Sequence, residues 1–300
     1  MSHVDDVREF LSSRRARLSP EQAGLPAYGG NRRVKGLRRE EVALLAGVSV
    51  DYYVRMERGS LSGASDSVLE SLARALQLDD VEREYLYDLA RQSPTPGPRA
   101  RATSPKLRPV VQQVLDAITD APAWVRNNRH DFLATNQMAR ALHAPMLEHQ
   151  PHPANSARFV YLDPAARDFF REWDRIAEDT AGYLRQEAAH TPHDKALHEL
   201  IGELSTQSEV FRRNWAAHNV RTHRAGMKKL HHPHVGDLDL NFESAELTSQ
   251  PGLILVIYTA NTGTPSADAL ALLGSLAATG RPDNVAIAPG NGTSPERPVS

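Results

Sequence analysis

Basic side chains are concentrated in two short blocks of this 300-residue sequence. The first block, Arg32 to Arg39, contains five Lys or Arg residues in eight positions, and the second, Arg91 to Arg108, contains five with no Asp or Glu. Clustered positive charge of this kind binds polyanions. Either block taken alone is more typical of a solvated charged surface, so the blocks indicate a polyanionic partner only together with other features.

The 13 histidines are the other candidates for chemistry, because histidine is a common metal ligand. His198 opens a His-Glu-x-x-His-like segment, but Gly202 stands where the second zinc ligand is needed. His218 and His223 are five positions apart, about 140° around a helix, so they do not share one helix face. We therefore predict no metal site and expect the histidines of segment 218–234 to pack or hydrogen-bond near strand ends.

The sequence carries none of the common signatures of enzymes. Zero cysteines exclude disulfides, Cys-based zinc sites, iron–sulfur clusters and thiol nucleophiles. The chain also has no Gly-x-Ser-x-Gly elbow, no phosphate-binding Gly-x-x-x-x-Gly-Lys loop and no dinucleotide-binding Gly-x-Gly-x-x-Gly fingerprint. We therefore predict a protein that is not an enzyme and carries no cofactor.

Composition divides the chain into two domains. Residues 93–105 include four prolines and one glycine without hydrophobic periodicity, which predicts a linker between domains at 1–92 and 106–277. Residues 278–300 are rich in Pro, Gly, Asn and Ser, which predicts a disordered tail. Each predicted domain is long enough to bury a hydrophobic core.

Hydrophobic spacing predicts a different fold class for each domain. Before the linker, apolar residues recur at helical spacing throughout, which predicts an all-α domain. After the linker, residues 123–136 are expected to form strand, turn and strand, and residues 226–260 alternate in the manner of antiparallel strands. With a helical stretch between them, this order predicts an α+β domain: two strands, helices, then about three strands.

The segment Gly36–Gly59 predicts two helices joined by a tight turn. Ala43 is small where the two helices would cross, and Gly47 tolerates the positive φ that the turn requires. Ser49 is suited to cap the second helix. These features indicate a helix-turn-helix.

At these residues the sequence resembles the Xre-type (Cro/repressor-like) helix-turn-helix family, including the terminal Glu57-x-Gly59. The resemblance implies that residues 50–58 form the recognition helix, which lies in the major groove of DNA. The preceding loop is longer than usual and would add a basic arm, formed by Arg32, Arg33 and Lys35. The other residues expected to contact DNA are Arg38, Arg39, Val50, Asp51, Tyr52, Arg55 and Arg58.

The resemblance also implies roles for these side chains. Arg55 is expected to pair with guanine, Asp51 to accept from cytosine N4, and Val50 to contact a thymine methyl group. Arg39 departs from the family, because many members have Gln at this position, and it could reach either a base or a phosphate. The residues expected near phosphates are Arg38, Arg39, Arg58 and Tyr52.

The resemblance extends over residues 5–275 to the MmyB-like regulator family of actinobacteria. It is carried by the helix-turn-helix together with Trp215-Ala-Ala-His-Asn-Val220 and His231-His-Pro-His-Val-Gly236, which precede an Ile-Tyr-Thr-Ala strand. The family implies an Xre-type domain followed by a ligand-binding domain of PAS-like fold. A fatty acid is the implied ligand in at least one member.

Large aromatic residues after the linker are the candidates to line such a pocket, although aromatic residues at helical spacing more often form plain core. An acidic lipid would also need a donor for its carboxylate, and Arg126 and Arg171 are the nearest by pattern. The candidate ligand-binding residues are Trp124, Arg126, Phe169, Arg171, Trp173, Phe211, Trp215 and Tyr258.

The partners follow from these features. The longest strongly apolar run, 253–258, is too short to cross a bilayer, and the first residues do not form a signal peptide, so we expect a cytoplasmic protein with no membrane partner. We expect double-stranded DNA as one partner, bound by a homodimer, and a small apolar or amphipathic ligand as another. The alternative is a C-terminal domain that binds a protein rather than a metabolite.

Overall fold

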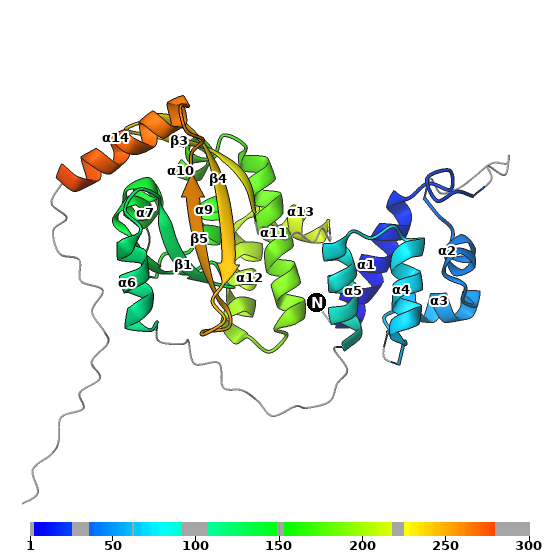
Figure 1. The fold of residues 1–300 in the computed structure, drawn as a ribbon. Helices are drawn as coiled ribbons and strands as arrows, with labels where there is room; N and C mark the ends of the chain where they lie inside the picture. Colours follow the sequence, from blue (N-terminus) through cyan, green and yellow to red (C-terminus); the bar gives the residue numbers. More distant parts are fainter. Residues whose placement is uncertain are drawn as a thin grey trace, which may run out of the picture.

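The computed structural model contains an all-α domain and an α+β domain (Figure 1). The basic arm and the predicted linker 93–105 lie outside the residues that it describes, as does most of the predicted tail. No helix among the described residues is long and apolar enough to cross a membrane. The described residues are 3–25, 36–61, 63–91, 107–148, 150, 153–217 and 225–279.

The N-terminal domain is built from helices that bury their apolar sides around one core. Within this core, the rings of Phe10 and Tyr85 pack edge to face with their centroids 4.9 Å apart. This all-α domain confirms the predicted fold class. Its helices are α1 (His3–Arg17), α2 (Arg39–Ala46), α3 (Val50–Glu57), α4 (Asp66–Ala75) and α5 (Asp80–Arg91).

The turn between α2 and α3 forms as its residue types predict. Gly47 adopts a left-handed conformation with φ of 66°, which costs glycine little because it has no Cβ. The Ser49 hydroxyl accepts a hydrogen bond from the Tyr52 amide and so caps α3. Ala43 is buried where α2 and α3 pack together. The helix-turn-helix geometry therefore follows from local residues.

The Glu57-x-Gly59 segment fixes the end of α3 against the rest of the domain. The buried Glu57 carboxylate lies 2.8 Å from Arg15 Nη2 on α1 and 3.0 Å from Arg39 Nε on α2. Gly59 has φ of 106°, and a Cβ there would lie 2.5 Å from a Val4 methyl carbon. The Glu57 carboxylate thus connects α1, α2 and α3. At position 59, only glycine allows the backbone to lie this close to Val4.

Within the described residues, the C-terminal domain combines helices with five strands, which confirms the predicted α+β class. After a first helix come two strands and a helical stretch, and three strands and a helix close the domain. The last helix continues to Thr279. The elements are α6 (Pro109–Ala117), β1 (Ala123–Asn127), β2 (Phe132–Thr135), α7 (Gln137–Leu142), α8 (Ala144–Leu147), α9 (Ser156–Leu162), α10 (Ala165–Phe169), α11 (Trp173–His190), α12 (Lys195–Gln207), α13 (Glu209–Ala216), β3 (Ala225–His232), β4 (Gly236–Glu246), β5 (Leu253–Thr259) and α14 (Pro265–Thr279).

The strands form one antiparallel sheet in the order β2-β1-β5-β4-β3. Because side chains alternate across a strand, the sheet has two distinct faces. The inner face, which includes Trp124, Leu230 and Tyr258, packs against helices α7 to α10 and α14. The outer face packs against Val111 and Leu115 of α6. Central β5 contributes to both cores.

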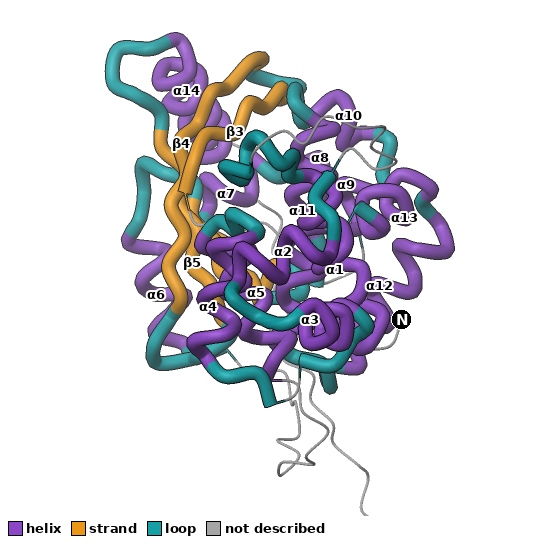
Figure 2. Tube along the Cα trace, turned by 90° about the vertical axis from the view of Figure 1, so that its right-hand side faces the viewer, coloured by secondary structure: helices purple, strands orange, loops and turns teal. Residues whose placement is uncertain are grey.

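The two domains meet where α5 packs against α11 (Figure 1). Helices α2 and α3 lie on the side of the N-terminal domain that faces away from the sheet. In Figure 2, viewed from that side, the helices of the N-terminal domain lie in front of the strands. The docked arrangement therefore leaves the helix-turn-helix uncovered.

The Glu57 contacts generate a stability prediction. Burial alone raises the pKa of Glu57, but the hydrogen bonds from Arg15 and Arg39 outweigh burial and lower it. Glu57→Gln removes the charge that both guanidinium groups share and should lower the free energy of unfolding by about 2–4 kcal/mol. Urea denaturation followed by circular dichroism measures this loss.

The pH dependence and a surface variant serve as controls. A carboxyl group with a lowered folded-state pKa stabilises fully above its unfolded pKa of about 4.3, and that stabilisation is lost as the pH falls through the folded value. The difference in the free energy of unfolding between wild type and Glu57→Gln should therefore become smaller as the pH falls below about 4. Exposed Glu40→Gln should change stability by less than about 0.5 kcal/mol. Equal effects of the two variants would contradict a structural role for Glu57.

Candidate functional site

The exposed side of α3 is the candidate DNA-binding surface. Tyr53 and Met56 face the domain core, so the opposite side of this two-turn helix faces solvent. Val50 is 45% exposed, although it is apolar. The predicted DNA-contacting residues at this surface, all exposed or half-buried, are Val50, Asp51, Tyr52, Arg55 and Arg58.

Arg55 is the cation best placed to enter a groove from this surface. Its guanidinium lies 4.9 Å from the centroid of the Tyr52 ring, a cation–π contact that orients the side chain along the helix. Arg38, at the N-cap of α2, is half exposed and lies 3.5 Å from Glu40. Weak surface pairs of this kind exchange readily for phosphate contacts.

The structure places Arg39 differently from the other predicted contacts. Its Nε and Nη2 atoms both donate to the Glu57 carboxylate, at 3.0 and 3.4 Å. Half of the side chain is nevertheless exposed. Arg39 therefore holds α2 against α3, and only its remaining N–H groups can face DNA. The sequence alone could not assign this role, because the partner is 18 residues away.

The candidate ligand site is a cavity of about 100 Å³ in the C-terminal domain. Side chains from the inner face of the sheet form one wall, and residues of α8 to α11 form much of the other. The rings of Trp124 and Phe132 are stacked 5.4 Å apart, and Tyr258 packs edge to face on Trp124. Phe242 also lines the cavity. Most of the enclosure is thus apolar and aromatic.

Three charged side chains line this apolar space. Arg126 on β1 and Lys228 on β3 are cations, and Asp179 on α11 is a carboxylate; all three are more than 90% buried. Burial lowers the pKa of Lys228 to about 8, against the opposing effect of Asp179. The cavity wall therefore carries one more positive group than negative ones, in surroundings where charge is costly to bury.

Two of the buried nitrogen atoms of the cavity wall have no hydrogen-bond partner among the described residues. They are Trp124 Nε1 and His143 Nε2. Burial, with the nearby charge of His232, lowers the pKa of His143 to about 3, so its ring is neutral at physiological pH. Because buried polar groups are nearly always paired, these nitrogens indicate a place for water or a polar ligand group.

The structure brings three of the eight predicted ligand-binding residues together. Trp124, Arg126 and Tyr258 line the cavity from the inner face of the sheet. Phe169 lies close by in the same hydrophobic core, with its ring 6.0 Å from that of His143. The remaining four lie elsewhere.

Arg171 does not reach the cavity, because acidic residues of β4 hold it at the surface. Its guanidinium lies 3.4 Å from Asp237 and 3.0 Å from Asp239. Arg126, the other predicted donor, is buried and stacks on the Tyr183 ring, 4.7 Å from its centroid. Of the two candidates for a carboxylate donor, only Arg126 therefore faces the cavity.

The remaining three aromatic residues belong to the packing of helices. Trp173 donates from Nε1 to the Val160 carbonyl at 2.9 Å and lies under the Arg167 guanidinium. The rings of Phe211 and Trp215 stack 5.5 Å apart within the helical core of α9 to α13. These side chains support the domain rather than the cavity.

Sequence reasoning missed Lys228, Asp179, His143 and Tyr183 as cavity residues. A signal existed for Lys228, because it lies two positions before Leu230 in β3 and therefore on the same, buried face of the strand. Tyr183 shares the apolar spacing of α11 with Ile176, seven residues earlier, but no such signal marked Asp179. Only the packing of α11 across the sheet brings them to β1 and β3.

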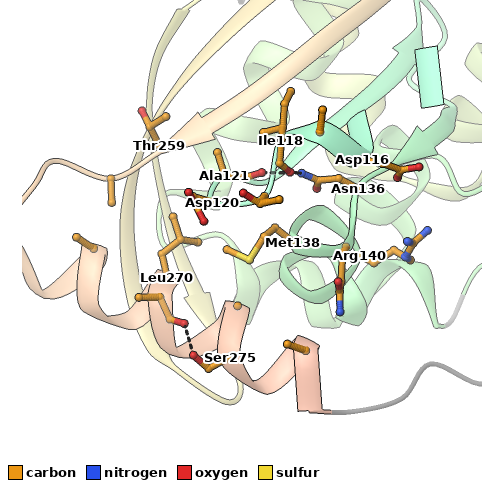
Figure 3. A pocket seen from close by; sticks show the side chains of 18 residues that line it. Asp116, Ile118, Asp120, Ala121, Asn136, Met138, Arg140, Thr259, Leu270 and Ser275 are labelled. Carbon is orange, nitrogen blue, oxygen red and sulfur yellow. Dashed lines mark hydrogen bonds between the residues drawn. The ribbon is translucent and has the colours of Figure 1, made fainter. Parts of the chain in front are cut away.

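A wider groove lies between α14, α7 and the turn before β1 (Figure 3). It has a volume of about 1250 Å³. Leu270, Met138, Asp116 and Asp120 are among the residues that line it. Most of the residues that line the groove are exposed, whereas most of those that line the smaller cavity are buried. Small-molecule sites bury most of the ligand, so we favour the smaller cavity as the ligand site.

His231 and His232, in the histidine-rich segment 218–234, make structural contacts. His231 lies 2.7 Å from Asp237, and His232 is hydrogen-bonded to the Ala141 carbonyl at 3.1 Å. Within the described parts of the chain, no group of three or more His, Asp or Glu side chains could hold a metal ion. His218 and His223 lie outside those parts.

Comparison with known protein families agrees with this arrangement of two domains. A helix-turn-helix domain family matches residues 8–86, and the MmyB-like transcription regulator ligand binding domain matches residues 107–273. No curated protein was found to match the chain. The second match spans more than half of the chain and includes every residue that lines the cavity. The chain is therefore a DNA-binding transcription regulator with a ligand-binding domain, and it belongs to the MmyB-like family.

Proposed function

We propose that the protein binds a specific duplex DNA sequence through α3 and does so as a homodimer. The exposed side of α3 offers one guanidinium, one carboxylate and one apolar side chain, a set suited to reading base edges. A single recognition helix reads only a few base pairs, and this class usually doubles its site across a two-fold axis. The basic arm would add contacts to the phosphate backbone.

We further propose that the C-terminal domain senses an amphipathic molecule with a negatively charged head group, for which a fatty acid is the model. The observation that carries this proposal is the set of groups in the cavity wall. Arg126, Lys228 and Trp124 Nε1 are all donors, and they lie among aromatic side chains. A carboxylate would accept from these donors and offset the excess positive charge, while its hydrocarbon chain would contact the rings.

The alternative, a domain that binds a protein partner, would require no internal cavity. A space lined mostly by buried residues, with buried donors among them, favours a small molecule instead. Pockets for drug-sized ligands have volumes of about 300–1,000 Å³, so the cavity of about 100 Å³ must enlarge to hold a hydrocarbon chain. Ligand binding therefore has to displace part of the wall.

The DNA proposal predicts the effect of removing Arg55. Arg55→Ala should weaken binding to a duplex selected by the wild-type protein by about 1–3 kcal/mol and relax the base preference at one position. Fluorescence anisotropy with the selected duplex and its single-base variants measures both effects. Arg83→Ala on α5, which removes another exposed cation of the same domain, beside Glu70, is the matched control and should change neither. Loss of affinity without any change in base preference would show that Arg55 contacts the phosphate backbone rather than a base.

The basic arm should contribute affinity without specificity. Replacing Arg32, Arg33 and Lys35 by Ala should weaken binding to selected and random duplexes alike. It should also reduce the slope of log Kd against log salt concentration by about 0.9 for each phosphate that the arm no longer neutralises. Titrations at several salt concentrations measure the slope. An unchanged slope would show that these residues do not contact the DNA phosphates.

The ligand proposal predicts a preference for negative charge. Dodecanoate should bind the full-length protein more tightly than dodecanol, and dodecyltrimethylammonium should bind most weakly. Lys228→Met should reduce the preference for dodecanoate over dodecanol at least about tenfold, or ~1.4 kcal/mol. Isothermal titration calorimetry provides the affinities.

Lys229→Met is the matched control, because this neighbouring side chain is 40% exposed and pairs with Glu172. It should leave the preference unchanged. If dodecanol binds wild-type protein as tightly as dodecanoate does, the buried cations do not recognise a head group.

A further inference from the structure

Helix α11 forms part of the cavity wall with one of its sides. Ile176, Asp179, Thr180 and Tyr183 line the cavity, and their spacing of three or four residues places them on one face of the helix. This face lies within the first eleven residues of an eighteen-residue helix. A ligand in the cavity would therefore lie directly against α11.

The remaining turns of α11 form the contact with the DNA-binding domain. Arg185 is 2% exposed, lies 3.3 Å from Asp6 on α1, and stacks on Trp215 of α13. Ala189 is buried within the core of the N-terminal domain. His190 lies 3.5 Å from Asp88 on α5. The same helix thus contacts both the cavity and two helices of the other domain.

Three residues, Arg126, Tyr183 and the smaller Ser244 of β4, line both the cavity and a cleft between the domains. Arg126 and Tyr183 line the cavity on one side and this cleft, of about 380 Å³, on the other. Residues of α5, including Glu84 and Asp88, line the far side of the cleft. The Arg126 guanidinium stacks on the Tyr183 ring, so the two side chains form one continuous wall.

This wall is the side on which the cavity can enlarge with least resistance. The strands behind Trp124 and Tyr258 are each hydrogen-bonded to a neighbouring strand on both sides, which restricts their movement. Behind Arg126 and Tyr183 there is open space rather than packed atoms. Packed side chains give way only where such space exists. A ligand larger than the cavity would therefore push this pair toward α5.

We infer that ligand binding displaces the Arg126–Tyr183 wall into the interdomain cleft and thereby loosens the docking of α5 on α11. The regulated element is then the interface between the domains, which sets where the recognition helix lies, while α3 itself stays uncovered. A ligand acts on DNA binding only if it favours one arrangement of the domains over another. This inference rests on the proposed ligand-sensing function of the cavity.

Amide hydrogen exchange of the full-length protein tests the inference in two ways. The first arm adds saturating dodecanoate to wild-type protein. The second fills the cavity without a ligand, by Val256→Phe on the inner face of β5, or by Val160→Phe on α9 if that variant does not fold. In both arms exchange should rise at least about fivefold in α5. It should stay unchanged in α4, which serves as the internal reference.

The matched control is Leu253→Phe, which adds the same ring to the same strand. Leu253 faces the outer core beneath α6, so this variant should leave exchange in α5 unchanged. Unchanged α5 exchange in both arms would overturn the inference, even if calorimetry shows that dodecanoate binds. A response to the filled cavity but no binding of dodecanoate would support the inference and reject the proposed ligand class.

A covalent link between the domains tests the consequence for DNA binding. Because the chain has no cysteine, Asp88→Cys with His190→Cys provides the only two thiols for a short bis-maleimide. The linked protein should bind the selected duplex with the same Kd with and without dodecanoate. The same double variant, with both thiols kept reduced and not linked, should keep a difference of at least about fivefold. A ligand response that survives in the linked protein would contradict control through docking.

Discussion

The buried guanidinium of Arg185 is the constraint on which the arrangement of the two domains depends. A charge removed from water must find compensation nearby. Arg185 finds it in both domains: in the carboxylate of Asp6 on α1, and in the ring and carbonyl of Trp215 on α13. Burial raises the pKa of Tyr85 on α5 to about 12, while the charge of Arg185 opposes that rise. Separation of the domains would therefore cost Arg185 part of its compensation.

The buried charges of this protein fall into two groups with different consequences. Arg185 and Glu57 are surrounded by partners, and each holds helices together. The cavity differs, because Arg126 and Lys228 outnumber Asp179 there. Trp124 Nε1, in the same wall, has no partner among the described residues. The paired charges of Arg185 and Glu57 stabilise the fold, whereas the excess positive charge of the cavity favours binding of an anionic group. For this reason we propose the cavity as the sensing site.

Sequence reasoning succeeded where local residue types decide the structure. Gly47 and Ser49 define the turn and cap of the helix-turn-helix, and alternation in residues 226–260 predicts the later strands. It failed to identify cavity residues that meet only through long-range packing. Lys228 and Asp179 face the same space from different elements, whereas Arg171, a donor equally plausible by pattern, is held at the surface by acidic residues of β4.

The central claim is that the cavity and the DNA-binding domain are energetically coupled through their shared interface. Such coupling is reciprocal, so DNA must change the affinity for the ligand by the same factor that the ligand changes the affinity for DNA. The most direct test is calorimetric titration of dodecanoate into the full-length protein, alone and saturated with its selected duplex. The two Kd values should differ at least about fivefold. Equal values, with dodecanoate bound in both cases, would contradict the coupling.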